Sequence, residues 1–190
     1  MVVVSREGPG GNGCPVERGG VTTDATAGQN DRVRVPTPAV AALVRAGVAH
    51  KVHEIGHDPA VTTFGKEAAA ALGVEPERVF KTLVASVDGK LVVALVPVSG
   101  ELSLKAVAAA RGAKSAEMAE PSTAERATGF VVGGISPIGQ RRRLPTLVDE
   151  SATRWATIFV SGGRRGLELE LAAADLVALT NGRLAPIGRS

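Results

Sequence analysis

The chain has 190 residues, of which 44% are hydrophobic and 3% aromatic, and its formal net charge is +3. This length suits one folded domain with an appendage, and the mildly basic balance is compatible with a polyanionic partner. The single cysteine excludes a disulfide framework, and no apolar run approaches the length of a membrane span. We therefore expect a cytoplasmic protein that needs no metal or cofactor.

Residues 1–35 are rich in glycine and show no apolar periodicity, so they cannot bury enough surface to offset the entropy of ordering. We predict a disordered or loosely attached N-terminal tail there, followed by one folded domain over residues 36–190. Cys14 lies in the tail, which leaves the domain without a thiol nucleophile.

The domain alternates helical and strand patterns along the chain. Helices are predicted at residues 37–47, 65–74, 103–112 and 172–182, with one or two short helices between residues 114 and 128. Strands are predicted at residues 50–55, 79–87, 90–98, 146–151, 156–163, 166–171 and 183–187. Asp88-Gly89 predicts a tight hairpin between two of these strands. The mixture indicates a single α+β domain, with a mostly antiparallel or mixed, barrel-like sheet surrounded by helices.

Lys81 interrupts the apolar strand predicted at residues 79–87. Strand alternation places Phe80 and Thr82 on the face opposite Lys81. A lysine in the middle of such a strand either reaches solvent or occupies a polar pocket, where its charge can hold a phosphate or a substrate oxygen. The pattern alone leaves both interpretations open.

Two glycine-rich segments stand next to arginines. Residues 133–137 read GGISP, and residues 160–166 read VSGGRRG. Adjacent glycines permit positive φ and can expose N–H groups that stabilise negative charge on a carbonyl oxygen, although a tight surface turn has the same composition. The arginines 141–143, 164 and 165 suit phosphate contacts, and a solvated charged surface is the simpler alternative.

Other catalytic patterns are missing from the sequence. His50 and His53 would point to opposite faces of a strand, and His57 belongs to a turn, so the three histidines predict no metal site. The chain has no G-x-S-x-G, P-loop or G-x-G-x-x-G motif. Ser136 and Ser161 lack an identifiable histidine–acid pair that would activate them.

The domain resembles the YbaK/EbsC family of aminoacyl-tRNA deacylases, which is related to the editing insertion domain of bacterial prolyl-tRNA synthetases. The segments that carry the resemblance are TPAVAALVRAG, HDPAVTTFGKEAA, VFKTLVAS, VPVSGELSLKAVA, AEMAEP, ATGFVVGGISPIGQRRRLPT and ATIFVSGGRRGLELEL. The resemblance implies trans-editing hydrolysis of mischarged Cys-tRNA(Pro), and of Cys-tRNA(Cys), with aminoacylated tRNA as substrate and prolyl-tRNA synthetase as a partner. Deacylation of another small amino acid, such as Ala or Ser, and a non-catalytic module that binds tRNA or a synthetase remain alternatives.

The resemblance also implies roles for individual residues. Lys81, Gly133 and Gly134 are the expected catalytic positions. The expected substrate-binding residues are Ile55, Phe64, Ile135, Ser136, Pro137, Ser161, Gly162 and Glu168, and the expected tRNA-binding residues are Arg141, Arg142, Arg143, Arg164 and Arg165. Ile55 stands where the family often has Tyr, and Glu168 where it often has Asp. In the family the substrate's own thiol is thought to attack the ester; an activated water is the alternative.

Overall fold

The computed structural model describes residues 36–56 and 64–189. The predicted N-terminal tail and His57 therefore lie outside the described residues, as does the side chain of Phe64. The described elements follow the chain in this order: α1 (Pro38–Ala46), β1 (His50–Glu54), α2 (Phe64–Leu72), the 3-10 helix η1 (Pro76–Arg78), β2 (Val79–Val87), β3 (Lys90–Pro97), β4 (Glu101–Leu102), α3 (Leu104–Arg111), β5 (Ala116–Met118), α4 (Pro121–Thr128), β6 (Thr146–Asp149), the 3-10 helix η2 (Glu150–Arg154), β7 (Ile158–Ser161), β8 (Leu167–Leu171), α5 (Ala173–Thr180), β9 (Arg183–Ala185) and β10 (Gly188–Arg189).

Two of the predicted elements need correction. The segment between residues 114 and 128 contains one strand, β5, before its helix α4, because residues 116–118 pair with the end of β2. Helix α5 ends at Asn181, which adopts the left-handed conformation with φ +51°, so it stops one residue before the glycine expected to end it. Asparagine tolerates this conformation better than most residues with a side chain.

The main sheet has the strand order β1-β8-β7-β2-β3-β6-β9, and β5 pairs with a separate part of β2. The pairs β2–β7, β3–β6 and β6–β9 are parallel, whereas the other pairs are antiparallel. The prediction of a single α+β domain around a mixed sheet is confirmed. The described end strands β1 and β9 do not pair with each other, so the sheet stays open.

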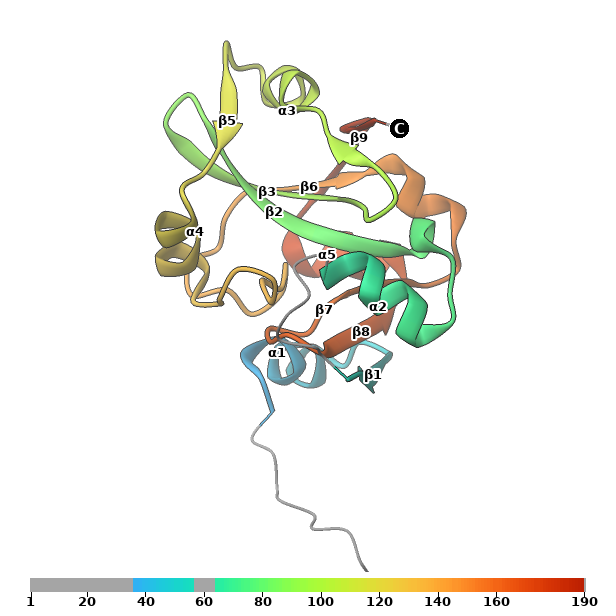
Figure 1. Cartoon of the computed structure of the whole chain (residues 1–190). Coiled ribbons are helices and arrows are strands. Elements are labelled where there is room, and N and C mark those ends of the chain that lie inside the picture. The colour runs from blue at the N-terminus through green and yellow to red at the C-terminus, as the bar shows by residue number, and fades with distance from the viewer. Residues whose placement is uncertain (1–35, 57–63, 190) are drawn as a thin grey trace, which may run out of the picture. The chain divides into compact units, whose positions relative to one another are not determined.

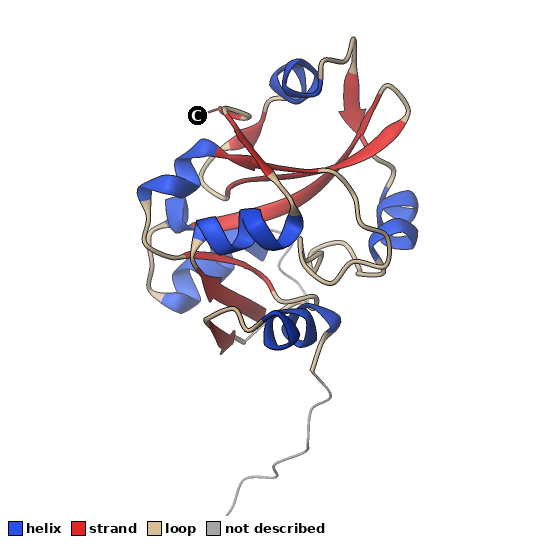
Figure 2. Cartoon of the chain, turned by 180° about the vertical axis from the view of Figure 1, so that it is seen from behind, coloured by secondary structure: helices blue, strands red, loops and turns tan. Residues whose placement is uncertain are grey.

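The β2–β3 hairpin lies at the centre of the domain. Its turn has positive φ at both Asp88 and Gly89, which is the type I′ geometry that the sequence predicts. Residues 92–96 of β3 are all buried, because the two faces of the hairpin belong to different parts of the core. Helices α2 and α5 lie on opposite sides of the hairpin (Figures 1 and 2).

Asp149, at the end of β6, joins the small β4–β10 sheet to the main sheet. Its Oδ2 accepts hydrogen bonds from the N–H groups of Ile187 (3.0 Å) and Gly188 (2.6 Å). Its Oδ1 accepts from the N–H (3.1 Å) and the hydroxyl (2.5 Å) of Ser151. Buried carboxylates need such partners, so Asp149 has a structural role.

Candidate active site

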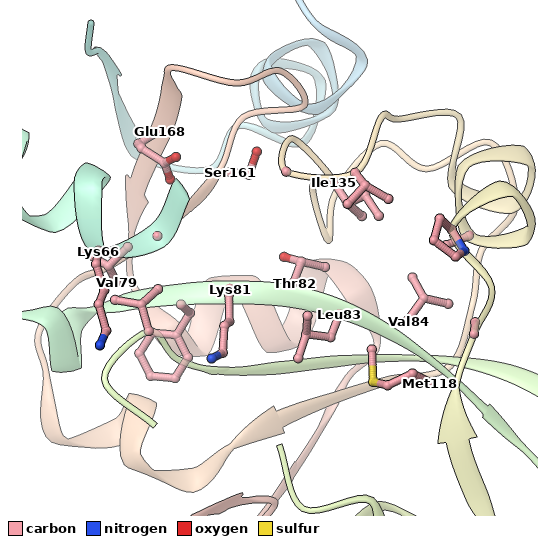
Figure 3. A pocket seen from close by; sticks show the side chains of 18 residues that line it. Lys66, Val79, Lys81, Thr82, Leu83, Val84, Met118, Ile135, Ser161 and Glu168 are labelled. Atoms are coloured by element: carbon pink, nitrogen blue, oxygen red, sulfur yellow. The ribbon is translucent and has the colours of Figure 1, made fainter. Parts of the chain in front are cut away.

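A cavity of about 510 Å³ lies beside the middle of β2. Its walls come from β2, the start of α2, the β5–α4 connection, the loop that follows α4, and strands β7 and β8. The lining residues are Gly65, Lys66, Val79, Phe80, Lys81, Thr82, Leu83, Val84, Val98, Met118, Ala119, Pro121, Ala124, Val132, Gly133, Ile135, Ser161 and Glu168 (Figure 3). Most of these side chains are apolar, as is usual for a small-molecule site with a few polar groups.

The cavity coincides with a gap in the pairing at one edge of β2. β7 pairs with the first two residues of β2 and β5 with its last three. The N–H of Ala119 donates to the carbonyl of Val84 at this edge (3.0 Å). Since alternate residues of a strand present their main-chain groups to the same edge, Thr82 presents its N–H and C=O to the gap. No described strand pairs with them there, so a ligand can satisfy them.

Lys81 is half-buried at the centre of this wall. Its Nζ donates to the carbonyl of Gly100 (2.6 Å), in the turn after β3. Burial lowers the pKa of Lys81; the charge of Glu101 raises it, and that of Lys66 lowers it further. Figure 3 shows Lys81 pointing to the opposite side of β2 from Thr82. Thr82 Oγ1 is buried without a hydrogen-bond partner among the described residues.

Glu168 and Ser161 face each other across the β7–β8 pair and line the same end of the cavity (Figure 3). Burial raises the pKa of the Glu168 carboxyl to about 7. Among the described residues nothing forms a hydrogen bond or ion pair with this carboxyl. The hydroxyl of Ser161 accepts a long hydrogen bond from the N–H of Gly163 (3.4 Å). No described histidine lines the cavity, so the carboxyl of Glu168 is the acid–base group that faces Ser161.

The GGISP loop forms another wall through Gly133 and Ile135. Gly133 has φ +87°, a conformation that a residue with a side chain rarely adopts. Gly134 does not line the cavity: its N–H donates to the Val131 carbonyl (2.9 Å), and an added Cβ would lie 2.9 Å from the Arg165 nitrogen. Gly134 thus lets the loop pack closely against the main chain of Arg164 and Arg165, whereas we expected it to be a catalytic position.

Ser136 and Pro137 also lie away from the cavity, contrary to our expectation. The Ser136 side chain is fully buried, and its Oγ accepts from the N–H of Ile138 (3.2 Å). Its carbonyl accepts from the side-chain amide of Gln140 (2.9 Å). Pro137 lines a separate cavity of about 340 Å³ on the other side of the loop. Both residues thus shape the loop that carries Gly133.

The start of α1 holds both glycine-rich loops. Thr37 caps the helix by accepting from the N–H of Val40 (3.3 Å), and its hydroxyl donates to the carbonyl of Gly162 (2.5 Å). Gly139, with φ +70°, packs so closely that an added Cβ would lie 2.5 Å from the Pro38 carbonyl group. The sequence predicted a helix over residues 37–47 but gave no indication of these tertiary contacts.

The five arginines do not line the cavity. Arg164 pairs with Glu54 (2.8 Å), and the Arg165 guanidinium donates to the Val132 carbonyl (2.9 and 3.2 Å), which fixes the start of the GGISP loop. Arg143 donates to the Leu179 carbonyl (3.3 Å). Arg141 and Arg142 are exposed at the surface next to the loop.

The profile of the aminoacyl-tRNA editing domain matches residues 57–179. The chain belongs to this family. EbsC of Enterococcus faecalis, provisionally named a Cys-tRNA(Pro)/Cys-tRNA(Cys) deacylase, is 44% identical over 124 residues, which cover 64% of this chain and 75% of EbsC. A proline–tRNA ligase of Thermosipho melanesiensis is 30% identical over 148 residues, which cover 72% of this chain and 26% of the ligase. The predicted family is therefore confirmed.

Solved structures agree with this assignment. A crystal structure provisionally described as a trans-editing enzyme for prolyl-tRNA synthetase superposes with a TM-score of 0.72 and 28% identity, over 80% of this chain and 96% of that one. A second, from a hypothetical protein, has a TM-score of 0.70 and 24% identity over 77% of this chain and 96% of that chain, which supports the fold alone.

Of the remaining residues that we expected to bind the substrate, Ile55 and Gly162 do not line the cavity. Ile55 packs against the buried cluster that contains Ala68 and Ala69 of α2, and its N–H donates to the Gly166 carbonyl (2.9 Å). Gly162 is buried and donates to the Leu167 carbonyl (2.7 Å). Phe64 begins α2, and its side chain lies outside the described part of the chain.

Two polar residues of the cavity were not singled out as functional from the sequence. Thr82 was predicted only to face away from Lys81, and Lys66 had no pattern to distinguish it from a solvated helix residue. Both line the cavity, and Lys66 lies at the same end as Glu168 (Figure 3). The described residues contain no cluster of His, Cys, Asp and Glu that could hold a metal ion. No described helix is long and apolar enough to cross a membrane.

Proposed function

We propose that this editing domain deacylates mischarged Cys-tRNA(Pro), and Cys-tRNA(Cys), in trans. The observation that carries the proposal is the cavity itself. It joins Lys81, Gly133, Ile135, Ser161 and Glu168, and it offers unpaired main-chain groups at the edge of β2, whereas no described cysteine or histidine lines it. Family membership and the 44% identity to EbsC support the choice of substrate.

In the proposed reaction the enzyme positions the substrate, and the cysteinyl thiol supplies the nucleophile. The sulfur bonds to the ester carbon, the ester C–O bond breaks, and the thiol proton passes to the ribose oxygen of the departing tRNA. The products are free tRNA and cysteine β-thiolactone, which water then opens. Proximity and stabilisation of the developing oxyanion suffice for such a step. The N–H groups of Gly133 and Ile135 have no acceptor among the described residues, so we assign the oxyanion contact to this pair.

Lys81 is the proposed cationic contact to the substrate. Its flexible side chain can exchange the Gly100 carbonyl for a substrate oxygen, because the site is half-buried and open at the β2 edge. Lys81→Ala should therefore abolish deacylation of Cys-tRNA(Pro), while thermal unfolding shows an intact fold. Lys90→Ala, an exposed lysine at the far end of the hairpin, is the matched control and should keep full activity. Full activity of Lys81→Ala would overturn the role of this residue.

The choice of nucleophile is tested with the substrate. Cys-, Ser- and Ala-tRNA(Pro) differ at one side-chain group, and only the first carries a thiol. We expect cleavage of Cys-tRNA(Pro) to exceed that of the other two by at least about a hundredfold, in line with the value of an intramolecular nucleophile. Equal rates for the three would show that water attacks and that the specificity is for small side chains in general.

We also propose that tRNA selectivity comes partly from prolyl-tRNA synthetase acting as a partner, in the cytoplasm. Within the described part of the chain, Arg143, Arg164 and Arg165 are engaged by Leu179, Glu54 and Val132, which leaves the exposed Arg141 and Arg142 as a small surface for holding a tRNA alone. A pull-down of the synthetase with the full chain, with and without tRNA(Pro), tests this partnership; failure to bind under both conditions would contradict it.

A further inference from the structure

We infer that the second cavity, of about 340 Å³, binds a backbone phosphate of the tRNA through Arg45, Gln140 and Arg143. The inference rests on the proposed function, because it concerns how the same substrate is held at a distance from the ester. Arg45 and Gln140 have no role in any prediction made from the sequence, and the cavity itself is separate from the candidate active site.

The second cavity is lined by positive charge without any negative charge. Its walls come from the end of α1, the segment at residues 137–146 and the end of α5. The lining residues are Ala42, Arg45, Ala46, Pro137, Ile138, Gly139, Gln140, Arg143, Leu144, Thr146, Leu179 and Thr180. Among these described residues the two arginines are the charged side chains, and none is acidic. Such a lining attracts an anion.

The polar side chains of this cavity have hydrogen-bond donors to spare. Arg45 is exposed in the last turn of α1, and no described residue pairs with its guanidinium. Arg143 donates one long bond to the Leu179 carbonyl (3.3 Å), which positions the guanidinium and leaves its other N–H groups available. The Gln140 amide donates one hydrogen to the Ser136 carbonyl (2.9 Å) and has a second. Two guanidinium groups and an amide suit the oxygens of a phosphate.

The position and exposure of the site favour a phosphate that belongs to a polymer. Ile135 lines the first cavity and Pro137 the second, so one short loop separates them. A tRNA whose esterified end occupies the first cavity carries backbone phosphates within reach of the second. Arg45 and Arg143 are both exposed, which suits a phosphate that stays partly in solvent, as backbone phosphates do. One added contact still leaves a small surface for tRNA, in keeping with a synthetase partner.

Arg45 also has a local role that an experiment must separate from phosphate binding. A basic side chain in the last turn of a helix favours the helix dipole. Arg111 is a matched control, because it is exposed in the last turn of α3, and both helices end at a left-handed glycine, Gly47 and Gly112. Arg111 lines neither cavity. A role confined to the helix would therefore be the same for the two arginines.

The experiment measures binding of uncharged tRNA(Pro) to the full chain and to Arg45→Glu, Arg45→Lys and Arg111→Glu, between about 50 and 200 mM salt. The two glutamate variants have the same net charge, so long-range attraction falls equally in both. We expect Arg45→Glu to bind about tenfold more weakly at low salt, because a charge-assisted contact is lost. Its slope of log K against log salt should be shallower by about 0.7. Arg45→Lys and Arg111→Glu should stay close to the wild type.

Equal losses of affinity and slope in Arg45→Glu and Arg111→Glu would overturn the site. Calorimetry with inorganic phosphate tests the source of the phosphate group. If Arg45→Glu abolished binding of inorganic phosphate but left tRNA binding unchanged, the cavity would take a free phosphorylated ligand, and the tRNA assignment would be wrong. Uncharged tRNA needs no deacylation. A wild type that shows the expected difference from Arg45→Glu but cleaves no Cys-tRNA(Pro) would therefore contradict the proposed function and leave this site standing.

Discussion

The Glu168 carboxyl has an environment that opposes its charge. It lines the cavity on β8, and burial alone raises its pKa from 4.5 to about 7. Between pH 4.5 and about 7, Glu168 therefore keeps its proton in the folded chain but releases it in the unfolded chain. The stabilisation from this proton is fully present below pH 4.5 and is lost as the pH rises through about 7.

Replacing the carboxyl by an amide should remove this pH dependence. Above pH 7, Glu168→Gln should be more stable than the wild type, by as much as about 3 kcal/mol, because one pKa unit corresponds to about 1.4 kcal/mol. Below pH 4.5 the two proteins should unfold alike. Urea unfolding of both at pH 4, 6 and 8 measures the difference. A difference that does not change with pH would show that folding leaves the pKa of Glu168 unshifted.

The glycine-rich loops depend on the N-terminus of α1 for their position. Thr37 makes the same capping contact as Ser103 does at α3, with N–H to hydroxyl distances of 3.3 Å in both. Only Thr37 also donates its hydroxyl hydrogen to a loop of the site, at the Gly162 carbonyl. A single residue thus combines a local role in the helix with a tertiary role in the site.

Comparison of the two caps separates these roles. Thr37→Val and Ser103→Ala should each lower the free energy of unfolding by about 1 kcal/mol, from the lost cap. Thr37→Val should in addition lower kcat/KM for deacylation by about tenfold, since small displacements of a site are costly. Ser103→Ala should leave it unchanged. Equal activities of the two variants would mean that the tie to Gly162 does not position the site.

The sequence was a good guide to those elements that depend on local signals. The helices predicted over residues 37–47 and 103–112 and the Asp88-Gly89 turn each require only a few neighbouring residues, and the structure contains all three. Lys81 was found because a charge in an apolar strand breaks the pattern. Its place in a cavity was left open by the sequence, since the pattern also allowed a lysine that reaches solvent.

The features that were missed depend on contacts between distant segments. Thr82 matters because β7 and β5 leave its edge of β2 unpaired, and nothing in VFKTLV encodes where those strands stop. Ser136 and Gly134 were expected in the site because they share a loop with Gly133. Their turn points them into the protein instead, which a linear motif does not reveal.

At the scale of the whole domain, one buried carboxylate holds the C-terminal strand. Both oxygens of Asp149 accept two hydrogen bonds, and two of the four donors are main-chain N–H groups of Ile187 and Gly188. Asp88 offers a useful comparison, because it also accepts from main-chain N–H groups, those of Lys114 and Ser115, but at an exposed position.

Asp149→Asn should lower the free energy of unfolding by about 3 kcal/mol, because its amide places hydrogens against buried donors. Asp88→Asn should leave it nearly unchanged, since water can replace the lost acceptor. Urea unfolding measures both values, and hydrogen exchange should show faster opening of β4 and β10 in Asp149→Asn alone. Similar losses in the two variants would show that burial does not decide the cost.

The gap in the pairing of β2 sets a limit on how stable this domain can become. Three more residues of β5 in register would bring the strand opposite Thr82, and they would occupy the space that the substrate needs. Selection for stability alone would favour pairing of these main-chain N–H and C=O groups, and they stay unpaired where a ligand binds. The same unpaired edge of β2 exposes the domain to inhibition by a short extended peptide that adds to the sheet as an extra strand.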